Sequence, residues 1–315
     1  MSRKKILSVK HLHQHFKIDR KTTVRAVNDV SFDIYEGETF SIVGESGSGK
    51  STLGRSLIRI YDYQQGDVTF LDEKISGPLK KDKEKSLRRN MQMIFQDPMA
   101  SLNPRKNILD IVALGLDINH LSHSAEDRKQ RVINVLESVG LSGSLINRYP
   151  HQFSGGQRQR IGIARALIVE PKFIIADEII SALDVSIQAQ VVNLMKKLQK
   201  QHNLTYMFIA HDLSMVRSIS DRVAVMHLGH IVELGTVKDI YENPLHPYTK
   251  SLLSSIPTPD PFGEKARIRQ LYNKHDIVYS DAVIHHLSDT HQVLASDHHL
   301  KRWKESLYDP YLREL

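Results

Sequence analysis

Residues 44–51 constrain the fold of this chain more than any other segment, because they fit the pattern G-x-x-x-x-G-K-[ST] at every fixed position. The apolar run 39–43 before them predicts a buried strand, and residues 52–60 after them predict a helix. Glycines let the backbone turn so that successive N–H groups point at one anion, and the helix that starts at Gly49 adds its positive N-terminal end. These flanking elements favour a phosphate-binding loop over the alternative, a Gly/Ser-rich surface loop.

The residue types in this loop suit a polyphosphate such as ATP. Lys50 would reach the outer phosphates as a point charge. The Ser51 hydroxyl would ligate Mg²⁺, which keeps several waters and takes few protein ligands. The residues expected to bind the nucleotide here are Gly44, Glu45, Ser46, Gly47, Ser48, Gly49, Lys50, Ser51 and Thr52.

Two other apolar runs end in polar side chains that could act on the same phosphates. Residues 173–176 lead into Asp177, expected to hold Mg²⁺ through water, and Glu178, expected to polarise the attacking water as general base. Residues 205–210 lead into His211, which could contact the γ-phosphate and that water. Taken singly, acids after a strand are often only solvated and a lone histidine is more often structural. The order of the motifs along the chain favours the catalytic interpretation.

Gln96 and Asp184 extend this set. Gln96 follows the strand-like run 91–95, and its amide can accept a Mg²⁺ contact and report its loss to the segment that follows. Residues 181–184, which end at Asp184, come directly after the acid pair. We expect them to cross a dimer interface beside the catalytic water.

A second anion site is predicted at the start of a helix expected over residues 159–169. The segment before it offers N–H groups and a hydroxyl, and it lies between the Gln96 strand and the strand that ends at Asp177. Because one chain carries this segment and one phosphate loop, we expect it to cap ATP held by a partner subunit's loop. The residues of this segment are Ser154, Gly155, Gly156 and Gln157.

The order of these motifs resembles that of the nucleotide-binding domain of ABC transporters, over roughly residues 6–255. The resemblance implies an α/β fold of the P-loop NTPase type, with a helical subdomain at about 98–163 and an N-terminal antiparallel sheet that includes 6–16 and 30–35. It also implies an aromatic side chain that stacks on adenine. Phe16 is our candidate, and the long loop 17–25 leaves Val24 or Arg25 open.

Other segments make the resemblance narrower. Residues 243–250 and 254–261, with 95–105 and 148–151, are similar to segments of the ATP-binding subunits of oligopeptide importers. In that family such a subunit pairs with a related, non-identical ATPase and with two membrane permease subunits. An external binding protein delivers the peptide. The resemblance implies the same partners here.

One position departs from the family pattern. The family normally has proline directly after the catalytic glutamate, where this chain has Ile179. Proline fixes φ and lacks an N–H, whereas isoleucine can adopt the same φ but restores a donor and loosens the unfolded chain. We therefore expect a mild effect on the link from Glu178 to Asp184, with hydrolysis retained.

The hydropathy and the charge of the sequence restrict the location and the binding partners that we expect. No stretch approaches the ~20 apolar residues of a membrane helix, and residues 1–5 lack the apolar run of a signal peptide. The net charge is +7, and much of the basicity lies in residues 80–89. We interpret this segment as a solvated hinge or helix face, with contact to anionic lipid as a lesser option. Nucleic-acid binding is not expected, because no recognised module for it is present.

We therefore predict a nucleotide-binding domain over residues 1–256 and a C-terminal accessory region over 257–315, polar and irregular except for a helix around 300–308. The predicted function is ATP hydrolysis that energises oligopeptide import, from a peripheral position on the cytoplasmic side of the membrane. One alternative is a soluble ATPase of the same superfamily acting on nucleic acid or ribosomes, which usually has a second cassette or a long coiled coil. Another is a largely regulatory subunit. Glu178 and His211 argue against it, and Ile179 keeps it open.

Overall fold

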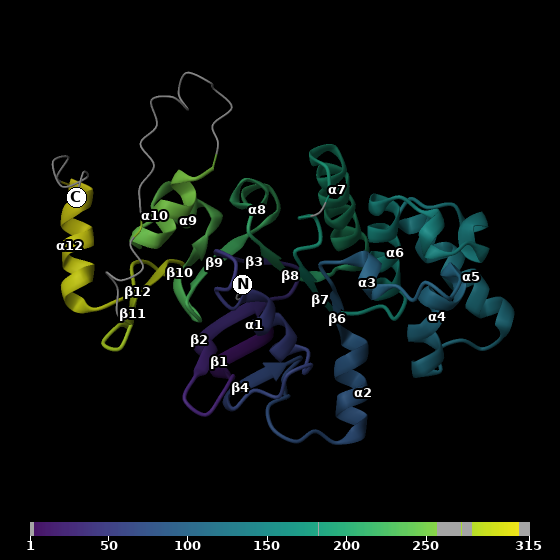
Figure 1. The fold of residues 1–315 in the computed structure, drawn as a ribbon, viewed down its shortest axis with the longest axis horizontal. Coiled ribbons are helices and arrows are strands. Elements are labelled where there is room, and N and C mark those ends of the chain that lie inside the picture. The colour runs from purple at the N-terminus through teal and green to yellow at the C-terminus, as the bar shows by residue number, and fades with distance from the viewer. Residues whose placement is uncertain (1–2, 182, 257–271, 273–278, 309–315) are drawn as a thin grey trace.

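The computed structural model describes residues 3–181, 183–256, 272 and 279–308, and its strands form two sheets (Figure 1). A small antiparallel sheet has the order β2-β1-β4-β5, and the central sheet has the order β11-β12-β10-β9-β3-β8-β7-β6. The small sheet consists of β1 (Lys5–Lys17), β2 (Thr23–Tyr35), β4 (Gln65–Phe70) and β5 (Glu73–Lys74). The central sheet consists of β3 (Thr39–Val43), β6 (Met91–Ile94), β7 (Phe173–Asp177), β8 (Thr205–Ala210), β9 (Arg222–His227), β10 (His230–Thr236), β11 (Val283–His286) and β12 (Gln292–Ala295).

The middle of the central sheet is parallel, as expected for the α/β fold that the family resemblance implies. β6, β7, β8, β3 and β9 run in one direction, with Ser41 of β3 opposite Phe208 of β8. Every residue of β3, β7 and β8 is buried. Their sequences are therefore mostly apolar on both faces rather than alternating. The sheet is not parallel throughout, because β10, β12 and β11 extend it in antiparallel fashion.

The helices that the sequence predicts are present, but their ends differ from the predicted ones by a few residues. α6 begins before the expected start at 159, because Ser154 and Gln157 form a capping box in which each side chain accepts a hydrogen bond from the other's backbone N–H. α1 ends before the expected end at 60, and Arg59 adopts a positive φ of 65°. The helices are α1 (Lys50–Leu57), α2 (Lys81–Asn90), α3 (Pro98–Ser101), α4 (Ile108–Asn119), α5 (Ala125–Ser138), η1 (Gly143–Asn147), η2 (Pro150–Gln152), α6 (Gly155–Leu167), α7 (Val185–His202), α8 (Leu213–Ile219), α9 (Val237–Glu242), α10 (Pro247–Ser254) and α12 (Asp297–Tyr308).

Apolar side chains pack on both faces of the central sheet. Phe173 and Ile175 of β7 pack on one face with residues of α1 and the small sheet. Ile174 and Ala176 point to the other face and pack with α6 and α7. A separate cluster joins the ends of β3 and β8 and residues of β9 and β10 to α8, α9 and α10. Burial of apolar surface on both faces stabilises this layered arrangement.

Residues 98–163, the expected helical subdomain, lie to one side of the central sheet, beyond β6 (Figure 1). Val112 of α4, Val132 of α5 and Ile161 of α6 are fully buried and belong to one apolar cluster. Arg128 of α5 donates hydrogen bonds to two carboxylates of α4. The helices therefore pack as a unit against each other as well as against the sheet.

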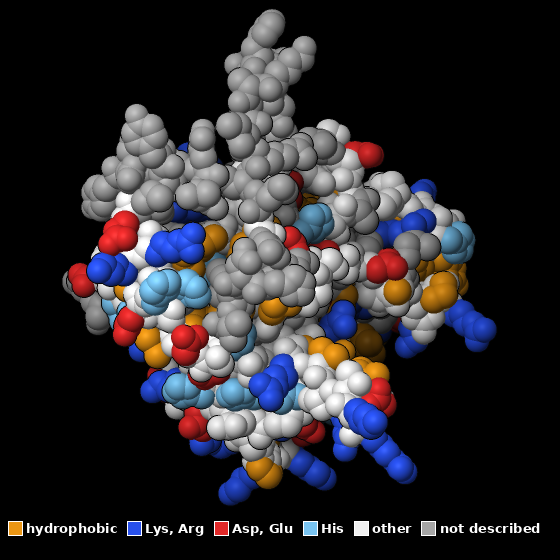
Figure 2. Space-filling view, turned by 60° about the vertical axis from the view of Figure 1, so that its left-hand side comes forward, with side chains coloured by type: hydrophobic (Ala, Val, Ile, Leu, Met, Phe, Trp, Pro, Cys, Tyr) orange, Lys and Arg blue, Asp and Glu red, His pale blue; other side chains and the backbone are white. Residues whose placement is uncertain are grey.

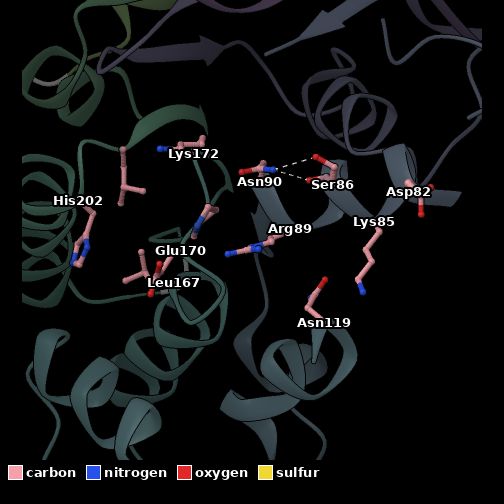
Figure 3. A pocket seen from close by; sticks show the side chains of 12 residues that line it. Asp82, Lys85, Ser86, Arg89, Asn90, Asn119, Leu167, Glu170, Lys172 and His202 are labelled. Atoms are coloured by element: carbon pink, nitrogen blue, oxygen red, sulfur yellow. Dashed lines mark hydrogen bonds between the residues drawn. The ribbon is translucent and has the colours of Figure 1, made fainter. Parts of the chain in front are cut away.

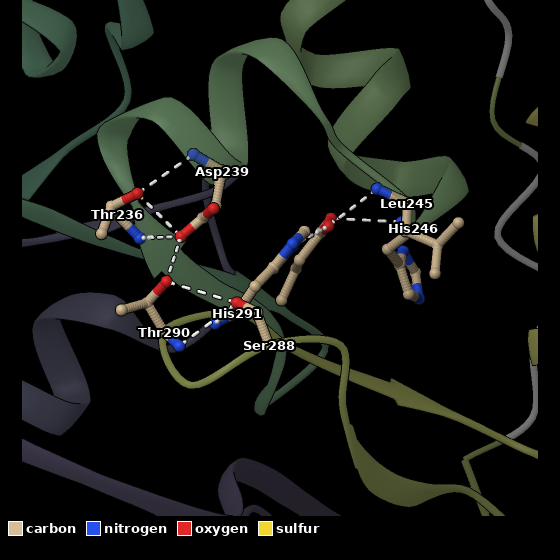
Figure 4. Close-up of polar contacts among 8 residues, drawn as sticks. Thr236, Asp239, Leu245, His246, Ser288, Thr290 and His291 are labelled. Carbon is tan, nitrogen blue, oxygen red and sulfur yellow. Dashed lines mark hydrogen bonds and ion pairs between the residues drawn. The ribbon is translucent and has the colours of Figure 1, made fainter.

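The C-terminal region contains more regular structure than the sequence predicts. The helix expected around 300–308 is part of α12, but β11 and β12 form a hairpin that the short runs of their sequence did not reveal. β12 pairs with β10, so this hairpin belongs to the central sheet. Buried His291 lies 2.8 Å from the buried carboxylate of Glu233, and Thr290 donates to Asp239 over 2.9 Å (Figure 4). These contacts anchor the hairpin to β10 and α9.

Histidine side chains lie at several separate places on the face shown in Figure 2 (pale blue). Among the described residues, no group of three or more His, Asp or Glu side chains is arranged to hold a metal ion. In the same part of the chain, no helix has the length and apolar character needed to cross a bilayer.

His246 gives the fold a predictable pH dependence. It is fully buried, burial lowers its pKa from 6.5 to about 3, and its Nδ1 accepts a hydrogen bond from Tyr248 N–H. Below pH 6.5 the unfolded chain binds a proton here that the folded chain does not, so stability falls as the pH decreases from about 6.5 towards 3.

Asparagine can accept the same bond without titrating. The free energy of unfolding can be measured with urea between about pH 7 and pH 5. Below about pH 6.5, it should fall by about 1.4 kcal/mol less per pH unit in His246→Asn than in the unaltered chain. Parallel pH profiles for the two proteins would contradict this assignment.

Candidate functional site

The predicted site residues gather at one edge of the central sheet. Because β3, β6, β7 and β8 are parallel, their carboxyl ends lie at the same edge. The phosphate loop follows β3, Gln96 follows β6, Asp177 ends β7 and His211 follows β8. The fold therefore brings together side chains that are more than a hundred residues apart in the sequence.

Two glycines allow the phosphate loop to fit between neighbouring backbones. A Cβ atom at Gly49, which has a φ of 107°, would lie 1.9 Å from the carbonyl oxygen of Ala26 on β2. A Cβ atom at Gly44 would lie 2.1 Å from the carbonyl oxygen of Met226 on β9. These distances exclude any side chain, so the pattern in the sequence reflects close backbone approach as well as anion binding.

Lys50 lies inside the loop. Its side chain is buried, and Nζ donates hydrogen bonds of 2.8 Å to the carbonyl oxygens of Gly44 and Glu45. Burial lowers the pKa of this amine, and the nearby carboxylates of Glu178 and Asp177 raise it. The ammonium group is therefore held by two backbone carbonyl oxygens of the loop, and an incoming phosphate could compete with them for it.

Ser51 and Asp177 form a pair that suits a divalent cation. Ser51 Oγ donates to Asp177 Oδ1 over 2.7 Å, and Asp177 is fully buried. Its Oδ2 has no hydrogen-bond partner among the described residues, and it lies 3.8 Å from Arg55 of α1. Burial raises the pKa of this carboxyl. A hydroxyl beside a carboxylate with a spare buried oxygen fits Mg²⁺, which prefers oxygen ligands. Sequence reasoning missed Arg55, although it lies one helical turn after Ser51.

Glu178 lies between Gln96 and His211. Gln96 Nε2 donates to Glu178 Oε2 over 2.8 Å, and His211 Nδ1 is 3.6 Å from the same oxygen. The backbone of Glu178 has a φ of 48°, a left-handed conformation that is uncommon for residues other than glycine. Its N–H donates to Ile209 and its carbonyl oxygen accepts from Ser181, so neighbouring strands and turns hold this conformation.

The segment Ser154 to Gln157 does not join this cluster. It starts α6 among the helices beyond β6, away from α1 (Figure 1). Ser154, Gly155 and Gln157 are exposed. Asp184 is exposed at the start of α7, and Ala182 lies outside the described residues. These residues are therefore available to another molecule, as the dimer hypothesis requires.

The adenine candidates lie where the two long strands of the small sheet pair. Phe16 is half-buried, pairs with Val24, and its ring lies edge-on to Tyr61 with a centroid separation of 5.2 Å. Val24 is exposed to 47% and Arg25 is exposed. All three remain candidates for the contact with the base.

The cavity in Figure 3, of about 710 Å³, is not part of this cluster. It is lined by residues of α2 and by Glu170, Lys172 and His202. These residues come just before β6, β7 and β8, at the amino ends of the parallel strands. The phosphate loop lies at the carboxyl ends, so the cavity and the site are at opposite edges of the sheet.

The fold and the site define the class of protein. The family described as "ABC transporter" matches residues 27–181. A dimeric ATP-binding cassette, MJ0796, solved in a post-hydrolysis state with ADP and Pi, has a TM-score of 0.66 and 30% identity, covering 73% of this chain and 98% of that one. CbiO1 from Clostridium perfringens, part of the ABC transporter complex cbiONQ, has a TM-score of 0.67 at 28% identity over 76% of this chain and 92% of that one. The chain is an ABC-type ATPase.

Curated relatives narrow the family. The oligopeptide transport ATP-binding protein OppF of Bacillus subtilis (strain 168) is 60% identical over 90% of both chains. OppF of Streptococcus mutans is 53% identical over 96% of this chain and 99% of that one. Residues 232–277 match the family described as "Oligopeptide/dipeptide transporter, C-terminal region". The chain belongs to the oligopeptide transport ATP-binding proteins, a branch of the ABC transporter family.

Ile179 can be tested directly. Its side chain is 2% exposed and packs in the cluster that contains α6 and α7. Ile179→Pro removes buried methyl groups but restricts the unfolded chain, and these effects oppose each other. We expect ATPase activity within about threefold of the unaltered protein, because the contacts of Glu178 come from other residues. Steady-state ATPase assays beside thermal melts would check this. A large gain in activity would mean that isoleucine impairs the site.

Proposed function

We propose that this chain binds and hydrolyses ATP to energise the import of oligopeptides across the cytoplasmic membrane. The observation that carries the proposal is the meeting of Ser51, Asp177 and Glu178 at the edge of the sheet where the phosphate loop begins. The oligopeptide-type C-terminal match over residues 232–277 supports peptides as the cargo.

In this proposal the loop binds ATP through its backbone N–H groups and through Lys50. Residues 44–52 surround the phosphates, and the positive end of α1 adds to the attraction. Ser51, Gln96 and Asp177 would hold Mg²⁺. The ion supplies charge neutralisation on the phosphate oxygens when it is bound. Phe16 would stack on adenine, and its edge-on contact with Tyr61 would support the ring.

Glu178 acts as general base for the attacking water. Gln96 donates a hydrogen bond to Oε2 of its carboxylate and His211 lies 3.6 Å from the same oxygen, which leaves Oε1 to accept the proton. His211 would also reach the γ-phosphate and report its presence to Glu178. Phosphoryl transfer requires mainly positioning and charge compensation, and these rigid strand ends supply the positioning.

A second ATP-binding subunit would complete the site. Ser154, Gly155, Gly156 and Gln157 would cap ATP on the partner's loop, and Asp184 would cross the interface beside the water. The resemblance to oligopeptide importers described under Sequence analysis implies that this partner would be related but not identical. The two sites of such a heterodimer need not be equivalent.

The remaining partners are two membrane permease subunits and, indirectly, an extracellular peptide-binding protein. The chain would sit peripherally on the cytoplasmic side, with residues 1–256 as the nucleotide-binding domain and 257–315 as its accessory region. On α4, Leu114 and Ile118 are 43% and 64% exposed. Such apolar side chains in the helical subdomain after Gln96 suit contact with a permease, through which closure of the subunits would be transmitted.

Glu178→Gln tests the catalytic role in the assembled transporter. The amide keeps the shape but cannot take a proton, so ATPase activity and peptide uptake should fall about 100-fold or more while nucleotide binding is retained. Exposed Glu242→Gln, the same change on α9, is the matched control and should leave both activities intact. If Glu178→Gln leaves ATPase and uptake of the complex unchanged, the chain is a regulatory subunit.

A further inference from the structure

One peptide unit of the phosphate loop is held at both of its polar ends. The unit joins Gly44 to Glu45. Its carbonyl oxygen accepts a hydrogen bond from Lys50 Nζ, and its N–H donates to the hydroxyl oxygen of Tyr248 over 2.8 Å. Tyr248 belongs to α10, about two hundred residues further along the chain.

The hydroxyl of Tyr248 occupies a fixed position. Its side chain is 1% exposed and packs with Val43 of β3, the residue just before the loop. The ring of His227, at the end of β9, lies 4.2 Å from it between centroids. A ring with so little freedom places its oxygen accurately, so the bond to Glu45 N–H constrains the loop rather than following it.

Contacts continue from Tyr248 to the C-terminal hairpin. Tyr248 N–H donates to His246 Nδ1, and the backbone N–H groups of Leu245 and His246 donate to the carboxylate of Glu233 over 2.7 and 3.1 Å. The same carboxylate meets His291, which precedes β12 (Figure 4). The buried carboxylate of Glu233 thus links the start of α10 to the hairpin. The hydroxyl of Tyr248, on α10, in turn bonds to the phosphate loop.

We propose that Tyr248 is a positioning residue of the phosphate loop, and that the C-terminal hairpin sets the loop geometry through Glu233 and Tyr248. The inference rests on the proposed function in taking ATP as the ligand. When Lys50 turns to the phosphates it leaves the carbonyl oxygens of Gly44 and Glu45. The hydrogen bond from Glu45 N–H to the Tyr248 hydroxyl would then still fix the Gly44–Glu45 peptide unit.

The consequence is a separation of binding from chemistry. The side chains proposed to act on the water, Gln96, Glu178 and His211, follow β6, β7 and β8. Among the described hydrogen bonds and ion pairs, none joins Tyr248 to these three residues. Loss of its hydroxyl should weaken ground-state and transition-state binding of ATP equally. That pattern raises KM and leaves kcat unchanged.

Tyr248→Phe in the full chain tests this, with fluorescent MANT-ATP and Mg²⁺ as the probe. Its Kd should rise about three- to tenfold, the effect of one lost hydrogen bond. In the assembled transporter KM for ATP should rise similarly, with kcat within a factor of about two. Tyr206→Phe is the matched control, because that hydroxyl is equally buried but donates to Met195 on α7. It should change stability without changing Kd.

His291→Ala tests the route from the hairpin. Alone it should raise the Kd for MANT-ATP by a smaller factor than Tyr248→Phe. Added to Tyr248→Phe it should have little further effect, because the hydroxyl through which it acts is already gone. An unchanged Kd in Tyr248→Phe, an equal rise in Tyr206→Phe, or additive effects in the double variant would overturn the proposal. Because Kd is measured without peptide or permease subunits, such a failure would leave the proposed transport function untouched.

Discussion

The parallel pairing of β3 with β8, and of β8 with β7, is the constraint on which the rest of the structure depends. It places the ends of three strands side by side, so that a loop, an acid pair and an imidazole face one volume. Complete burial of these strands fixes their register, since any slip would expose apolar side chains or bury a charge. The distances among Ser51, Asp177 and Glu178 follow from that register.

Much of this arrangement could be predicted from sequence because it is local. The loop 44–51, its strand and its helix are contiguous, and the buried parallel strands appear as mostly apolar runs. What could not be predicted depends on long-range contacts. Arg55 has no motif to mark it, and its value comes from lying near Asp177. The left-handed backbone of Glu178 also has no sequence signal, because a glutamate there looks like any strand end.

The C-terminal region shows the same limit in another form. β11 and β12 have four residues each, too few for periodicity to be read. Their place in the central sheet depends on β10 and on the buried pair of Glu233 and His291. The resemblance to oligopeptide importers identified residues 243–250 as distinctive, but only the structure shows that this segment touches the phosphate loop.

The capping box at Ser154 and Gln157 has a consequence for assembly. The box uses the acceptor side of the Ser154 hydroxyl and the carbonyl oxygen of the Gln157 amide. The hydroxyl proton and the amide NH₂ are not used by the box, so a neighbouring phosphate could accept from them without breaking a bond. The capping box already orders these two side chains before any contact is made. In the proposed dimer, the segment therefore loses little conformational entropy on contact. In the proposed dimer, the affinity between the subunits at this segment then depends on the negative charge of the bound nucleotide. The contact is lost when the phosphate is released.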